Sequence, residues 1–215
     1  MIKTGKNKII DLTRVIAHGD SGVELETAKT IGVDGWNAKT LHLYSHSGTH
    51  MDAPIHFEVN EQTIDNIVVN RFLGKAWVVD LSNVQPGHLI TISDLGEVAN
   101  KLNEGESLLI KTGWNAFFGT SKFRDELPRI SKDLALWCGK KKVNMLGVEP
   151  PSVADVNNIN EVTEIHQILM KNDIIIIEGL VNLEQIKSST VTLIALPLKV
   201  KNGDGAPARV IAIED

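Results

Sequence analysis

The segment from His46 to His56 constrains the fold of this chain more than any other stretch. Three histidines and an aspartate follow one another at intervals of four, two and four residues: His46, His50, Asp52 and His56. In an extended strand they would all point to one side, but His46 and Asp52 would lie about 20 Å apart. Ligands of one metal ion lie about 2.0–2.2 Å from it, so a shared ion requires the chain to bend sharply. Gly48 and Pro54 are the positions where a bend costs least.

The residue types in this segment indicate a catalytic metal site. A helix would also pair His46 with His50, but Gly48 and Pro54 disfavour one. Imidazole and carboxylate together suit Zn²⁺, Mn²⁺ or Fe²⁺ better than Ca²⁺. Two histidines and one aspartate leave a coordination position open, which is typical of catalytic rather than structural zinc. The alternative interpretation is a set of ordinary polar loop residues, but their packing around a glycine and a proline favours metal.

Two residues farther along the chain could complete the site. His166 lies at the margin of the apolar stripe of a helix expected over 161–171, for which Asn160 is the expected N-cap. Glu178 directly follows four consecutive isoleucines, which predict a buried strand. Burying a carboxylate there is costly unless it is paired or binds a metal. Either residue could instead face solvent, so each supports the metal site only if the two share a partner.

Strand patterns outnumber helix patterns along the chain. Short apolar or alternating runs predict strands over 8–12, 40–46, 76–81, 108–112, 143–148, 174–177, 191–196 and 210–213. Helical patterns cover 93–102, 132–137 and 161–171. Residues 14–38 are polar and punctuated by glycines, which predicts a long loop. Together these elements favour an α/β or α+β fold with a mostly buried sheet or barrel.

The composition excludes several classes of protein. The 215 residues are 42% apolar with a net charge of −5, so we expect one domain over 1–215 and no nucleic-acid partner. One cysteine, Cys138, excludes a disulfide framework and a four-cysteine zinc site. No apolar run is long enough to span a membrane. Met1–Ile10 lacks the apolar stretch of a secretion signal, so we expect a cytoplasmic protein without membrane partners.

Once these residues are assembled, the sequence resembles the metal-dependent cyclase family, whose best-known members are the bacterial kynurenine formamidases. The resemblance rests on HSGTHMDAPIHF at 46–57 and on His166 and Glu178 in EIHQILMKNDIIIIEGLVNL. It extends to IIDLT at 9–13, to KTGW at 111–114 and to the closing LPLKVKNGDGAPARVIAIE. It implies a mixed α/β fold with a small β-barrel-like core flanked by helices, assembled as a homodimer or homotetramer.

The resemblance also implies roles for individual residues. His46, His50 and Asp52 would bind one divalent metal ion, and Asp52 would bridge to a second ion. That second ion would be held by the two later residues of the motif, His166 and Glu178. His56 would be the catalytic acid and base. The ions are expected to be Zn²⁺, with Mn²⁺ as the alternative. The implied reaction is hydrolysis of a small-molecule amide, as in the arylformamidase step of tryptophan catabolism that converts N-formylkynurenine to kynurenine and formate.

Two segments depart from the pattern of kynurenine formamidases. Glu149-Pro150-Pro151-Ser152 stands where Asp-Thr-Pro-Ser is common, and Arg14-Val15-Ile16 replaces the usual residues of the early loop. Both lie outside the metal motif and therefore bear on the choice of substrate. Hydrolysis of a cyclic amide such as isatin is accordingly the alternative within hydrolases. Trp36, Trp114, Phe117 and Phe118 are candidates for an aromatic pocket wall, the two tryptophans as substrate-binding residues.

Two other classes of function stay open. A serine or cysteine hydrolase would need an activated nucleophile, yet no G-x-S-x-G motif occurs and Cys138-Gly139 has no elbow motif nearby. A non-catalytic metal-binding protein would use the same ligands without turnover. Replacement of His56 separates this possibility from the enzyme, because only the enzyme would lose a reaction.

Overall fold

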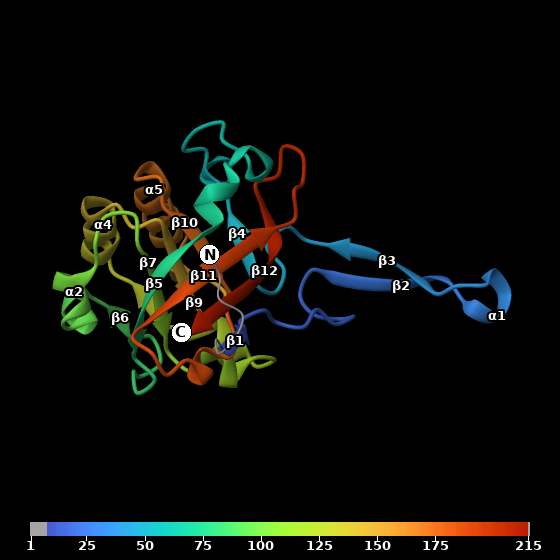
Figure 1. Cartoon of the computed structure of the whole chain (residues 1–215), viewed down its shortest axis with the longest axis horizontal. Helices are drawn as coiled ribbons and strands as arrows, with labels where there is room; N and C mark the ends of the chain where they lie inside the picture. Colours follow the sequence, from blue (N-terminus) through green and yellow to red (C-terminus); the bar gives the residue numbers. More distant parts are fainter. Residues whose placement is uncertain (1–7, 215) are drawn as a thin grey trace.

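One sheet organises the chain, and most of it closes into a barrel. The computed structural model describes residues 8–214, so most of the segment Met1–Ile10, in which a secretion signal was not expected, lies outside the described residues. The strands of the main sheet follow the order β1-β12-β11-β5-β7-β9-β10-β4, and an additional pairing of β12 with β4 closes seven of them into a ring (Figure 1). The expected mixed α/β fold with a barrel-like core is confirmed.

The bounds of the elements follow the chain from β1 to β12. The main sheet contains β1 (Lys8–Asp11), β4 (His50–Asp52), β5 (Leu73–Asp80), β7 (Ser107–Lys111), β9 (Met145–Val148), β10 (Ile175–Glu178), β11 (Thr190–Pro197) and β12 (Gly205–Glu214). Two small sheets pair β2 (Val23–Lys29) with β3 (Ala38–Leu43) and β6 (Leu89–Ile90) with β8 (Arg129–Ile130). The α-helices are α1 (Ile31–Asp34), α2 (Val98–Lys101), α3 (Ser121–Asp125), α4 (Lys132–Lys141) and α5 (Ile159–Lys171). Short 3₁₀ helices are η1 (Pro54–Phe57), η2 (Ile64–Asn66), η3 (Val69–Phe72), η4 (Ile92–Leu95), η5 (Trp114–Phe117) and η6 (Leu183–Gln185).

The parallel half of the barrel is buried on both faces. Strands β5, β7, β9 and β10 run parallel to one another, and α4 and α5 pack side by side over them (Figure 1). Ile177 packs into the barrel interior, whereas its neighbour Ile176 packs into the cluster beneath the two helices. Two buried faces explain why these strands read as continuous apolar runs. None of the helices in residues 8–214 is long and apolar enough to cross a membrane.

The expected strands are present, but three details differ from the sequence predictions. The helix expected over 93–102 is divided into η4 and α2, because Gly96 between them has a φ of 53°. Asn158 rather than Asn160 caps α5, since its side chain accepts the backbone N–H of Glu161. The loop predicted over 14–38 is present only over 14–22, because residues 23–38 contain β2 and α1 and reach the start of β3.

Strands β2 and β3 form a hairpin arm, Val23–Leu43, that extends away from the barrel (Figure 1). At its outer end Ile31 is 66% exposed, Val33 88% and Trp36 58%. Both faces of the arm are largely solvated in the single chain, so its sequence lacks the buried stripe by which strands are recognised. The absence of a buried stripe explains why the sequence pattern predicts a loop over residues 23–38.

Candidate metal centre

Strand pairing brings the first candidate ligands together. β4 is antiparallel to β10, and its register places His50 directly opposite Glu178. His50 and Asp52 lie on the same face of β4, because side chains alternate along a strand. His50 Nε2 lies 3.2 Å from Glu178 Oε2 and 3.7 Å from Asp52 Oδ1. Strand β10 thus ends with the Glu178 carboxylate beside His50 and Asp52 of the histidine motif.

A bend at Gly48 returns His46 to the same place. Gly48 has a φ of 62°, which is the left-handed conformation that suits glycine. His46 Nδ1 then lies 2.9 Å from Asp52 Oδ1. Gly205 leaves room for the imidazole, because a Cβ at that position would lie 2.7 Å from His46 Cε1. The sequence prediction of a sharp turn at Gly48 is confirmed, and Pro54 begins η1.

Helix α5 contributes His166 from the other side of the site. Its Nε2 lies 3.4 Å from Glu178 Oε1 and 3.7 Å from Asp52 Oδ2. The Nδ1 atoms of His166 and His50 lie 2.7 Å and 3.1 Å from the carbonyl oxygens of Val162 and Gly48. When each Nδ1–H donates to its carbonyl, both Nε2 atoms are free to bind a cation. His166 and Glu178 therefore contact each other, and both lie beside Asp52, which meets the condition for including them.

The donor atoms form two groups that have one residue in common. Atoms of His46, Asp52 and His56 lie within 4.8 Å of one another, and so do atoms of His50, Asp52 and Glu178. The Asp52 side chain is 1% exposed, and its Oδ2 has no hydrogen-bond partner among residues 8–214. A buried, unpartnered carboxylate oxygen is costly unless a cation satisfies it. The donor set and this oxygen therefore fit a divalent metal ion bound beside Asp52.

Charges inside the cluster favour its ionised carboxylates. Burial alone would raise the pKa of Glu178, but hydrogen bonds from His166 and His50 outweigh burial and hold it well below its usual range. The Val153 N–H also donates to Glu178 Oε1 at 2.7 Å. For His166 burial lowers the pKa, while Glu178 and then Asp52 raise it above its usual value. The buried Glu178 carboxylate thus carries the negative charge that a cation site needs.

His56 differs electrostatically from its neighbours. Burial and the nearby His46 and His166 lower the pKa of His56, although Asp52 and Asp204 oppose the shift. For His46 burial is outweighed by Asp52 and Asp204, which raise its pKa to about 9. The His56 ring stacks on that of His46, with 3.9 Å between centroids, and its side chain is 25% exposed. A neutral, partly accessible imidazole beside a metal site is suited to carry protons.

Asp204 is a site residue that sequence reasoning missed. Its Oδ2 lies 3.0 Å from His46 Nε2 and 3.5 Å from His56 Nδ1. It lies in the turn before β12, between Gly203 and Gly205. A signal was present in the closing motif NGDGAP, where an acidic residue lies between two glycines just before the last apolar stretch of the chain. Asp204 orients both imidazoles from the solvent side.

A cavity of about 220 Å³ opens beside the metal centre. Its walls include two of the three motif histidines, two phenylalanines, a tyrosine and two arginines: His46, His50, Phe118, Phe123, Tyr44, Arg14 and Arg124. Trp114 does not line it, because this side chain is 2% exposed and its Nε1–H donates to the Phe123 carbonyl. Trp36 lies on the arm and does not line it either. Of the four aromatic candidates, Phe118 alone lines the cavity, and Phe123 was not anticipated.

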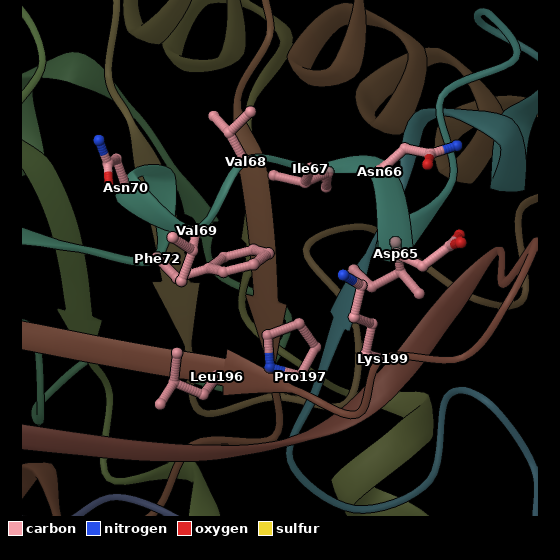
Figure 2. Close-up of a pocket in the computed structure, with 11 residues that line it drawn as sticks. Asp65, Asn66, Ile67, Val68, Val69, Asn70, Phe72, Leu196, Pro197 and Lys199 are labelled. Carbon is pink, nitrogen blue, oxygen red and sulfur yellow. The ribbon is translucent and has the colours of Figure 1, made fainter.

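Two other features do not contribute to this site. A larger hollow of about 680 Å³ lies between η2, η3 and the end of β11, where Phe72, Leu196 and Pro197 face one another (Figure 2). No candidate metal ligand lines it. Cys138 is fully buried in α4, and burial raises the pKa of its thiol to about 12. A thiol in that environment is not a nucleophile, so the structure disfavours the cysteine hydrolase.

Comparisons with known proteins agree with this geometry. Residues 10–155 match the model of the Cyclase family, described as “Putative cyclase”. The kynurenine formamidase of Bacillus mycoides is 32% identical over 178 residues, which cover 81% of this chain and 79% of the relative. That of Bacillus cytotoxicus is 32% identical over 194 residues, covering 90% and 88%.

Solved structures show the same fold. An isatin hydrolase bound to the product analogue thioisatinate superposes with a TM-score of 0.88 at 22% identity, covering 98% of this chain and 94% of that one. A predicted metal-dependent hydrolase from Bacillus stearothermophilus has a TM-score of 0.79 at 26% identity, covering 98% and 100%. The matched residues of the family model include the whole histidine motif from His46 to His56. On these matches the chain belongs to the Cyclase family.

Proposed function

We propose that this protein is a metal-dependent amidohydrolase, formed by one domain over residues 1–215, that acts as an arylformamidase. The reaction would convert N-formylkynurenine to kynurenine and formate. The observation that carries the proposal is the pair of donor groups sharing Asp52, whose buried Oδ2 has no partner among the described residues. The curated relatives named kynurenine formamidase support this choice of substrate. A cytoplasmic location belongs to the same proposal, because enzymes of amino-acid catabolism meet their substrates there.

Two divalent ions, Zn²⁺ with Mn²⁺ as the alternative, are proposed for the site. His46, His50 and Asp52 would hold one ion, and Asp52, His166 and Glu178 would hold the other. Ions of this kind lower the pKa of a coordinated water to about 7 and polarise a substrate carbonyl. His50 also lies 3.2 Å from Glu178, so it would be within reach of either of the two proposed ions. The imidazole and carboxylate donors suit these metals.

His56 would move the protons of the reaction. Its neutral imidazole would accept a proton from the attacking water and later deliver it to the leaving amine. Asp204 Oδ2 lies 3.5 Å from His56 Nδ1 and would orient the ring for both steps. The buried environment that lowers the pKa of His56 keeps the ring neutral at physiological pH, ready to act first as the base.

Hydrolysis of a cyclic amide is the second candidate. It is favoured by the close match of the barrel to isatin hydrolase structures, and by Phe118 and Phe123, which could hold a flat ring. A non-catalytic metal-binding protein would have the same ligands and no turnover on either substrate. The deciding experiment assays zinc-loaded protein on N-formylkynurenine and isatin, with and without chelator. Turnover of N-formylkynurenine that chelator abolishes supports the proposal, and turnover of isatin alone replaces it with the second candidate.

We also propose that the chain forms a homodimer or homotetramer through its arm. The apolar side chains at the outer end, Ile31, Val33 and Trp36, are more than half exposed in the single chain. Apolar side chains gathered on a projecting hairpin are typical of an interface. Trp36 lies at the outer end of the arm, far from the cavity beside the metal centre of its own chain. It could therefore line that cavity only in a second copy of the protein. Light scattering tests this: Val33→Asp together with Trp36→Ser should yield monomers, and an unchanged mass would refute the role of the arm.

A further inference from the structure

Arg14 lies beside the metal centre and is tied to the strands that form it. The Arg14 backbone N–H donates to Thr49 Oγ1 at 2.9 Å, and the Thr49 hydroxyl donates to the Gly179 carbonyl at 2.7 Å. Thr49 precedes His50, and Gly179 follows Glu178. The position of Arg14 is therefore set by the same two strand segments that hold candidate metal ligands.

The Arg14 side chain lies in the wall of the cavity. Its Cζ is 3.8 Å from the centroid of the Phe118 ring and 5.2 Å from that of Phe123. His46 and His50 line the same cavity. A guanidinium that stacks on an aromatic face keeps its N–H bonds in its own plane, where they are available to a planar acceptor. The wall also includes Arg124, which pairs with Asp125 at 2.9 Å, and Asp20, whose Oδ2 accepts the Ala17 N–H at 2.9 Å. Arg14 is thus the cation of the wall that lacks such a partner among the described residues, and candidate metal ligands lie in another part of the same wall.

The charge of Arg14 lacks a direct partner among residues 8–214. Its Nη2 is buried and forms no hydrogen bond, and no carboxylate there is within ion-pair distance. Burial lowers the pKa of Arg14, and the more distant Asp20 and Glu149 raise it. Glu149 Oε2 is already occupied, since it accepts the Thr112 N–H at 2.6 Å. A half-buried cation without a direct partner costs free energy that a bound anion would recover.

We propose that Arg14 binds a carboxylate of the substrate, and that the enzyme therefore prefers aryl amides bearing an acidic group. This inference rests on the proposed amidohydrolase function. A guanidinium matches the two oxygens of a carboxylate with parallel N–H bonds. The phenylalanine rings would flank the body of the substrate, with the scissile amide placed toward His46 and His50.

Two substrates that differ in one carboxylate test this directly. Zinc-loaded protein is assayed on 2-formamidobenzoate and on formanilide, and the variant is Arg14→Met. We expect kcat/KM for 2-formamidobenzoate to fall about 10- to 100-fold, mainly through KM, while that for formanilide changes less than twofold. The matched control is Lys122→Met, because Lys122 stacks on Phe117 at 3.9 Å outside the cavity. It should change neither substrate by more than twofold.

The outcomes separate this inference from the function on which it rests. An equal fall on both substrates would show that Arg14 only packs against the rings, and no change on either would show that it does not contact substrate. If zinc-loaded protein hydrolyses neither of these amides nor N-formylkynurenine, the proposed function fails, and calorimetry with benzoate and benzamide tests Arg14 separately. The inference predicts benzoate binding that weakens at least tenfold in Arg14→Met. Equal affinity in both proteins, or no benzoate binding by the wild type, overturns it.

Discussion

Replacement of His56 by alanine should abolish turnover and leave the metal in place. The structure makes this a discriminating change, because His56 lies within 4.8 Å of donor atoms of His46 and Asp52 and could itself be a ligand. If His56 is a metal ligand, its replacement should lower the metal content, whereas if it is a proton carrier the metal content should stay unchanged. In our account His56 carries protons, since its pKa is lowered and its side chain is 25% exposed.

The expected magnitudes follow from the contacts of His56. Its side chain contributes a 3.5 Å contact with Asp204 and a stacked ring at 3.9 Å from His46, so removing it should cost about 1 kcal/mol of stability. In a chain of this size that corresponds to a melting temperature about 2–4 °C lower. Loss of a general acid and base should reduce kcat by about 10²- to 10⁴-fold.

The assay measures kcat and metal per chain on the same preparation. We expect His56→Ala to retain the wild-type metal content, and His56→Gln serves as a control that preserves most of the side-chain volume. Wild-type kcat/KM should fall as the pH drops through the lowered pKa of His56, because protonation removes the base. Loss of one metal ion from His56→Ala, or activity within threefold of wild type, would refute the reasoning.

Three further predictions concern other parts of the molecule. Glu178→Gln should weaken metal binding at least 100-fold, measured by competition with a chromogenic chelator, and unchanged affinity would remove Glu178 from the site. Cys138→Ala should retain full activity and lose about 1–2 kcal/mol of stability in urea, whereas lost activity would revive the thiol mechanism. Burial opposes the shift at Glu106, but bonds from Asn103, Lys75 and Trp77 lower its pKa from 4.5 to about 2. Its stabilisation is therefore present above pH 4.5 and lost as the pH falls toward 2. Glu106→Gln should destabilise the protein by about 1–2 kcal/mol at pH 7 and hardly at all at pH 2 in thermal unfolding, and an equal loss at both would refute it.

The metal centre was largely predictable because its signals are local. The spacing from His46 to His56 requires a bend, and Gly48 provides it with a φ of 62°. Glu178 could be recognised from the sequence because it is a carboxylate that directly follows four consecutive isoleucines of a buried strand. Periodicity could not show that β4 and β10 pair with His50 opposite Glu178, since that register depends on closure of the barrel.

The parts that were missed depend on contacts distant in the sequence. Asp204 reaches His46 across 158 positions, and its local signal, an acidic residue between Gly203 and Gly205, does not show that it meets the histidine motif. The first strand of the arm, β2, was not recognised, because neither face of the arm packs on a core, whereas β3 overlaps the strand predicted over 40–46. Trp114 was a candidate for the pocket wall only because it is aromatic, and it is in fact buried in a small cluster with Phe123. In each case the position or the burial of the residue depends on tertiary packing, which the local sequence does not determine.

The central claim is that Asp52 joins two divalent metal sites, and metal content tests it most directly. The protein is stripped, reconstituted with Zn²⁺, freed of excess ion and analysed by mass spectrometry for metal per chain. Wild-type protein should contain two ions per chain, and Asp52→Asn should lose both, because each donor group depends on that carboxylate. Fewer than one ion per chain in reconstituted wild-type protein would contradict the account.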